Sequence, residues 1–161
     1  MIKKNRMLAV LSLLAPAAIV LAATHPAEAD GAEMSLKDKQ QWAEMSKHID
    51  AKAAQATEKC GTTITASFDI PSFKGQDLFR QSPTGACRDA VNTVTAICAS
   101  DLGKATVQKS VSTITCRRSN DGTKVSREGK NVVIHLDPAK TAIVGKEKGS
   151  YSWKSALEET L

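Results

Sequence analysis

Two of the three histidines of this 161-residue chain are the side chains that most directly suggest chemistry. His48 lies in the segment SKHID, and His135 lies in the segment IHLD. Two imidazoles can cleave a phosphodiester when one ring takes the proton of a 2′-hydroxyl and the other protonates the leaving oxygen. A nearby cation is also needed, because negative charge builds up on the phosphorus-bound oxygens in the transition state. Phosphodiester hydrolysis by His48 and His135 is therefore one chemistry that the sequence allows.

Both segments resemble the histidine segments of pancreatic-type ribonucleases, the first on an N-terminal helix and the second on a late strand. The resemblance implies a small, secreted, basic and disulfide-bonded α+β protein that uses His48 and His135 as its acid/base pair. Lys59, beside Cys60, and Lys74 are the candidates for the catalytic lysine of that family. A small secreted phosphodiester hydrolase is our alternative hypothesis for the function.

The sequence lacks the common catalytic and metal-binding motifs, and this favours a different class of function. It contains no nucleophile elbow G-x-S-x-G, no zinc-protease motif H-E-x-x-H, no phosphate-binding glycine loop and no calcium-loop pattern. No C-x-x-C motif occurs and no histidine lies at ligand spacing from a cysteine, so we predict neither a metal site nor a cofactor. Our leading hypothesis is a non-catalytic binding or structural domain of the cell envelope or extracellular space.

A local group of basic residues is the candidate contact for a partner. Its members flank the turn at residues 119–122 and are Arg117, Arg118, Lys124 and Arg127. Such a group can bind a phosphate or an acidic partner, and it can equally protect an edge strand from unwanted pairing. We expect the partner to be an envelope or extracellular protein or an anionic polymer. Six aromatic residues are too few to favour stacking on sugars or on single-stranded nucleic acid.

The first 29 residues have the layout of a cleaved bacterial-type secretory signal peptide. Three basic residues precede the apolar run Met7–Ala23, and Ala27 and Ala29 lie at positions −3 and −1 before Asp30. We therefore expect a mature chain of residues 30–161, exported to the periplasm or the medium, with no transmembrane segment. Cleavage would lower the formal net charge from +5 to +3, because the leader holds three basic residues and one acidic residue. Hydrophobic residues at 42% and charged residues at 24% are typical of a single globular domain.

Four cysteines in an exported chain predict two disulfides. Cys87 and Cys98 are eleven residues apart on one expected helix, so the rise of the helix separates them by about 16 Å. A disulfide requires Cα atoms within about 7 Å, and this excludes a bond between these two residues. Of the two remaining pairings we favour Cys60–Cys98 with Cys87–Cys116. The pairing of Cys60 with Cys87 stays open, because the loop at residues 69–83 is long enough to reverse the direction of the helix.

Apolar periodicity predicts an α+β domain. A stripe at helical spacing over residues 34–59 consists of Trp42, Met45, Ile49, Ala53 and Ala56. The other expected elements are a strand at 62–68, a helix at 84–102, strands at 107–117, 123–127 and 132–136, and a short helix at 152–161. Turn residues at 119–122 and 128–131 predict two consecutive hairpins. We therefore expect an antiparallel sheet of about four strands, with the disulfide-bonded second helix packed on one face.

Overall fold

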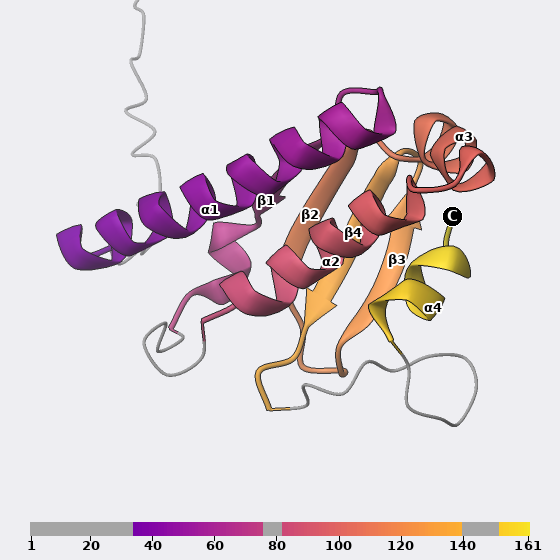
Figure 1. Cartoon of the computed structure of the whole chain (residues 1–161). Helices are drawn as coiled ribbons and strands as arrows, with labels where there is room; N and C mark the ends of the chain where they lie inside the picture. The colour runs from indigo at the N-terminus through magenta and orange to yellow at the C-terminus, as the bar shows by residue number, and fades with distance from the viewer. Residues whose placement is uncertain (1–33, 76–81, 140–151) are drawn as a thin grey trace, which may run out of the picture. The chain divides into compact units, whose positions relative to one another are not determined.

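A four-stranded sheet with helices on one face forms the described part of the chain (Figure 1). The computed structural model describes residues 34–75, 82–139 and 152–161, so the expected signal peptide lies outside the described residues. The elements are α1 (Leu36–Cys60), β1 (Thr65–Phe68), the 3-10 helix η1 (Ile70–Phe73), α2 (Thr84–Ile97), α3 (Asp101–Ser110), β2 (Thr113–Arg118), β3 (Lys124–Glu128), β4 (Asn131–Leu136) and α4 (Trp153–Glu158). The α+β class is confirmed, and so is a short helix near the C-terminus.

Helix α1 forms as its sequence pattern predicts. The Ser35 side chain caps the N-terminus by accepting a hydrogen bond from the Asp38 amide, and Gly61 ends the helix at φ 66°. The whole predicted stripe from Trp42 to Ala56 is buried, together with Cys60. The Trp42 ring lies 5.3 Å from both Phe68 and Phe73, so β1 and η1 close the core beneath the first half of α1.

The sheet is mixed, and the expected antiparallel arrangement is wrong. Strand order is β1-β2-β4-β3, with β1, β2 and β4 parallel and only β3 antiparallel to its neighbour β4. Helices α2 and α3 carry the chain from β1 to β2, and such a crossover allows parallel pairing. The turn at 119–122 does not close a hairpin between neighbours, because β4 lies between β2 and β3. The turn between Glu128 and Asn131 does close one, with Gly129 at φ 64°.

The single helix expected at 84–102 is two helices. Helix α2 ends at Ile97, and Ser100 caps a new helix, α3, by accepting a hydrogen bond from the Gly103 amide. The segment expected to begin a strand at residue 107 belongs to α3, whose Val107 and Ser110 are buried at helical spacing. Gly103 therefore lies in the first turn of a helix. A Cβ there would meet the Ile97 carbonyl oxygen, so the corner between the two helices needs glycine.

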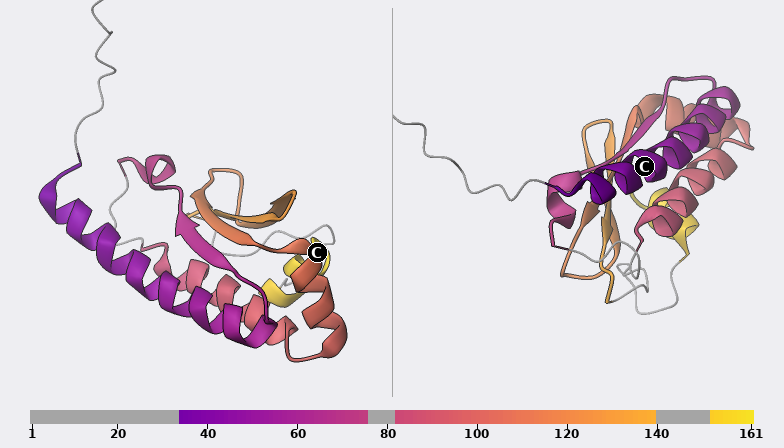
Figure 2. Two further views of the ribbon diagram at one scale, coloured as in Figure 1. Left: turned by 90° about the horizontal axis from the view of Figure 1, so that it is seen from above. Right: turned by 90° about the vertical axis from the view of Figure 1, so that its left-hand side faces the viewer.

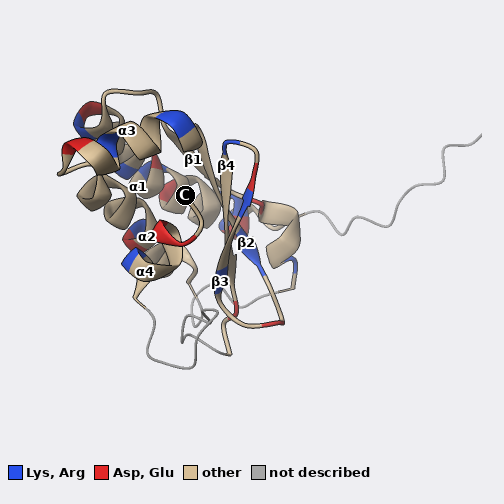
Figure 3. Ribbon diagram, turned by 90° about the vertical axis from the view of Figure 1, so that its right-hand side faces the viewer, with Lys and Arg blue, Asp and Glu red and all other residues tan. Residues whose placement is uncertain are grey.

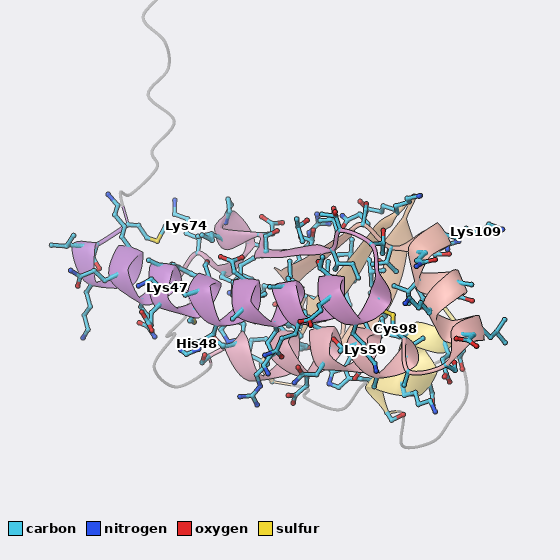
Figure 4. The ribbon with its side chains drawn as sticks, turned by 45° about the horizontal axis from the view of Figure 1, so that its top comes forward. Lys47, His48, Lys59, Lys74, Cys98 and Lys109 are labelled. Atoms are coloured by element: carbon cyan, nitrogen blue, oxygen red, sulfur yellow. A yellow bond between two sulfur atoms is a disulfide. The ribbon has the colours of Figure 1, made fainter. Side chains whose placement is uncertain are left out.

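Two disulfides attach α2 to its neighbours at both ends. Cys60–Cys98 joins the end of α1 to the end of α2, with Cα atoms 5.2 Å apart. Cys87–Cys116 joins the first turn of α2 to the middle of β2, with Cα atoms 6.0 Å apart. This is the pairing favoured from the sequence. Figure 4 shows Cys98 close to the C-terminal end of α1.

The two faces of the sheet differ in their covering. Viewed from above, the α-helices lie on one side of the strands (Figure 2). Ile114, Cys116, Val132 and Ile134 point to that side and are fully buried in the core. Within the described residues, no helix combines the length and the apolar character needed to span a membrane.

Candidate functional site

The face of the sheet opposite the α-helices carries mainly polar side chains, and we call it the open face. Alternation along the strands places every second residue there. Its residues are Thr65 and Ser67 of β1, Thr113, Thr115 and Arg117 of β2, Asn131, Val133 and His135 of β4, and Lys124, Ser126 and Glu128 of β3. Thr115 Oγ1 donates to Asn131 Oδ1 at 3.0 Å, which places two of these side chains in direct contact.

His135 occupies the middle of a basic row on the open face. It is the register partner of Arg117 on β2 and of Lys124 on β3. Neighbouring strands lie about 4.8 Å apart, so the three side chains leave the sheet side by side. Figure 3 shows Lys and Arg coloured along the ribbons of β2 and β3. His135 and the basic residues were predicted as separate features of the sequence. The strand pairing places Arg117 and Lys124 beside His135 on the open face.

The environment of His135 disfavours its charged form. Burial of the ring lowers the pKa of His135 below its ordinary value, and the positive charges of Lys124 and Arg117 lower this pKa further. Glu128 and Asp121 act in the opposite direction and do not reverse the shift. His135 is thus neutral at pH 7, and its Nε2 lies 2.9 Å from the hydroxyl oxygen of Ser126.

A polar pocket opens beside His135 at the end of the sheet. It has a volume of about 450 Å³ and is lined by Ser72, Arg118, Ser119, Asn120, Asp121 and His135. We call it the His135 pocket. The Nε of Arg118 is buried and has no hydrogen-bond partner among the residues that the structure describes. A buried guanidinium N–H without an acceptor costs free energy.

Neighbouring contacts hold the walls of the pocket in place. The Ser72 hydroxyl accepts a hydrogen bond from the Arg118 amide at 2.9 Å, which ties η1 to the end of β2. The buried Asp137 accepts hydrogen bonds from the amides of Gly122, at 3.0 Å, and Ala139, at 2.9 Å. Asp137 therefore anchors the loop that follows Asp121 to the end of β4.

Arg117 forms an ion pair at the rim of the open face. Its Nε donates to Asp69 Oδ2 at 2.9 Å, and both side chains are partly exposed. The carboxylate orients the guanidinium and neutralises part of its charge. Because the pair is partly exposed, a stronger acceptor can compete for the remaining donors of Arg117.

The structure does not bring His48 and His135 together. His48 projects from α1, is 65% exposed and lies 3.6 Å from Glu44 Oε1 (Figure 4). Helix α1 packs on the covered side of the sheet, whereas His135 faces the open side, so the backbone of the sheet separates the two rings. Lys59 and Lys74, the candidates for a catalytic lysine, are exposed on α1 and after η1. An acid/base pair of His48 and His135 in one cleft is therefore not formed.

The predicted basic group divides between the two faces. Arg117 and Lys124 flank His135, and Arg118 lines the pocket beside it. Arg127 points to the covered side instead, where its NH1 donates to the Leu161 carbonyl oxygen at 3.1 Å. Three of the four predicted contacts thus gather around His135.

The sequence did not identify several of the residues that line this site. Ser126, Ser72 and the loop residues Ser119 and Asn120 each lack a motif of their own. The spacing of Lys124 and Ser126 is the one available signal, because two residues along a strand share a face. That signal becomes useful only once β3 is known to pair with β4.

Within the described ranges, no three His, Cys, Asp or Glu side chains gather where they could hold a metal ion. Comparisons with known proteins add no assignment. No protein-family model, no curated protein and no solved structure matches this chain.

Proposed function

We propose that this chain is an exported, non-catalytic binding domain whose open face binds an anionic polymer. The observation that carries the proposal is the gathering of Arg117, Arg118 and Lys124 around His135 and its pocket. Arg117, Arg118 and Lys124 place cationic hydrogen-bond donors on the two strands that flank β4, and such donors can bind successive negative groups of one ligand. Two disulfides are compatible with export.

The composition of the open face favours a polymer over a folded protein. Protein interfaces depend on large apolar or aromatic anchors near their centre. Among the described residues, the large apolar side chains that are exposed are Met34, Leu36 and Leu102, and they lie at the start of α1 and on α3. The open face offers hydroxyl, amide and charged groups instead, and these can follow the charges of a flexible chain.

The test is a titration of ¹⁵N-labelled residues 30–161 with two soluble polyanions, polyphosphate and polyglutamate, at low and high salt. We expect amide shifts to concentrate at Arg117, Lys124 and His135 and to weaken in high salt, because exposed charges are screened. Lys124→Glu should weaken binding at least about tenfold, which corresponds to about 1.4 kcal/mol. Lys109→Glu, the same charge change at an exposed site on α3, is the matched control and should bind normally.

Two results would overturn the proposal. One is the absence of shifts on the open face with either polyanion at low salt. The other is an equal loss of binding in the Lys124 and Lys109 variants, since this would show attraction by net charge alone.

One contact supports a second candidate function. The distance of 2.9 Å between Ser126 Oγ and His135 Nε2 would allow the neutral imidazole to activate the hydroxyl as a nucleophile. Such a hydrolase should react covalently with a fluorophosphonate probe, and Ser126→Ala and His135→Gln should each abolish the labelling. A chain that binds polyanions and remains unlabelled supports the binding domain.

A further inference from the structure

We propose that the His135 pocket binds a tetrahedral oxyanion, the phosphate or sulfate group of its ligand, together with one proton that His135 takes up. This inference rests on the proposed function and adds to it the chemical class of the bound group and the way that pH controls its binding. It follows from the donors that line the pocket and from the balance of charges around it.

The lining of the pocket is rich in hydrogen-bond donors from separate elements. Arg118 comes from the end of β2, Ser119 and Asn120 from the following loop, Ser72 from η1 and His135 from β4. A tetrahedral oxyanion has several acceptor oxygens and can receive bonds from Arg118, Ser119, Asn120 and His135. The Ser72 hydroxyl already donates to the Asp69 carbonyl oxygen at 2.6 Å, so Ser72 only borders the site. The planar guanidinium of Arg118 matches two such oxygens.

The fixed charges around the pocket include no excess of basic groups. Arg117, from β2, is paired with Asp69, which follows β1. Arg118 and Asp121 both line the pocket. On β3, Lys124 and Glu128 both interact with His135. Together with the buried Asp137, which anchors the loop beside the pocket, these groups make three basic against four acidic residues, a formal charge of −1 around a neutral His135.

Protonation of His135 therefore decides how strongly the pocket repels or attracts an anion. When the ring is neutral, the surroundings offer donors without a net positive charge. When the ring is protonated, the site gains one positive charge and a further N–H donor. A bound dianion stabilises this charged form and raises the pKa of His135 from its lowered value in the free protein. Because the bound state then holds more protons than the free state, the anion binds more tightly as pH falls.

The probe for this linkage is inorganic sulfate, which remains a dianion between pH 5 and 8. Any change of affinity with pH in that range must therefore come from the protein. We expect the Kd for sulfate to fall about tenfold between pH 7.5 and 5.5, since uptake of one proton allows at most tenfold per pH unit. Isothermal titration calorimetry at pH 7 in two buffers of different ionisation enthalpy should detect fractional proton uptake on binding. Parallel titrations with inorganic phosphate and with polyphosphate show whether the pocket binds a free anion or a group carried on a polymer.

Three variants make the test specific. His135→Gln should remove the pH dependence and keep the weak affinity of the high-pH state. Arg118→Lys keeps the charge but loses the planar donor, so it should weaken sulfate binding at both pH values while preserving the pH dependence. His48→Gln is the matched control, because this exposed histidine lies on the other side of the sheet, and it should behave as the wild type.

Sulfate affinity that does not change with pH would overturn the inference, and so would a His48 variant that loses the pH dependence. Failure to bind sulfate at millimolar concentration would also overturn it. If polyphosphate or polyglutamate still shifts the open face in that case, the proposed binding function stands and the oxyanion pocket does not. If neither polymer nor sulfate binds, both proposals fail.

Discussion

The half-buried ring of His135 lies between two basic side chains, and the folded protein therefore resists its protonation. The unfolded chain takes up this proton near pH 6.5, whereas the folded chain does so only at lower pH. Between these values the unfolded state binds more protons, so the contribution of His135 to stability is present above pH 6.5 and is lost as pH falls. We expect the free energy of unfolding to decrease with acidification across this window.

Urea unfolding of the wild type and His135→Gln between pH 5 and 8 measures this contribution. The variant should show a shallower dependence on pH below 6.5, because glutamine does not titrate. Identical slopes for the two proteins would show that the ring is not desolvated in the folded state.

The close surroundings of Gly103 allow a prediction about the stability of a second variant. A methyl group at this position would meet the backbone of Ile97 and the Ser100 side chain, so Gly103→Ala should destabilise the protein by about 1–3 kcal/mol. Gly85, in the first turn of α2, has open space around its missing Cβ. Gly85→Ala is the matched control and should stabilise by up to about 1 kcal/mol, because alanine favours helix. Thermal unfolding of both variants gives the comparison, and equal effects would contradict the tight α2–α3 corner.

At the scale of elements, the disulfides set how firmly α2 is held. The bonded cysteines are 38 residues apart in Cys60–Cys98 and 29 residues apart in Cys87–Cys116. Loop-closure entropy depends weakly on such a difference, so each bond should contribute about 3–4 kcal/mol, with less than about 0.5 kcal/mol between them. Chemical unfolding of the two double Cys→Ala variants tests this expectation. A much larger loss for one pair would mean that packing around its sulfur atoms, and not chain entropy, dominates.

Helix α1 could be predicted because its signal is local and long. Its stripe repeats over about five turns between a serine cap and a glycine cap, and no strand pattern competes with it. Helix α3 could not be separated from a strand in the same way. The β-branched Val107 was predicted to begin the strand that follows, and Gly103 was predicted to end the helix before it. Both residues lie within α3. The close approach of Ile97 that requires this glycine is a tertiary contact that the sequence does not display.

Local sequence signals also could not predict the order of the strands in the sheet. Turn residues show where the chain reverses, but they do not show which strand becomes the neighbour, and β4 lies where β3 was expected. The same limit applies to the candidate site. His135, Arg117 and Lys124 were each identified, yet only the pairing of β2 with β4 and of β4 with β3 makes them neighbours. Arg127 belonged to the same sequence cluster, and strand alternation places it on the other face.

At the scale of the whole molecule, the signal peptide expected from the sequence allows a prediction about the mature protein. Expression of the full chain in a bacterium should yield an exported protein that starts at Asp30, since Ala27 and Ala29 suit signal peptidase. Intact-mass analysis of the exported material measures this, and Ala29→Arg should block cleavage and leave the longer chain. A full-length mass for the wild-type protein in the periplasm would contradict the predicted cleavage.

The interleaved strand order has a consequence for how the chain assembles. The β3–β4 hairpin joins residues that are close in sequence, so it can form early. In contrast, Thr65 of β1 must find Thr113 of β2, across the whole of α2 and α3. Non-local parallel pairing of this kind slows folding, and we expect the docking of β1 with α1 to be the late step. Until then the edge of β2 is unpaired, which makes the half-assembled chain the species most prone to aggregation.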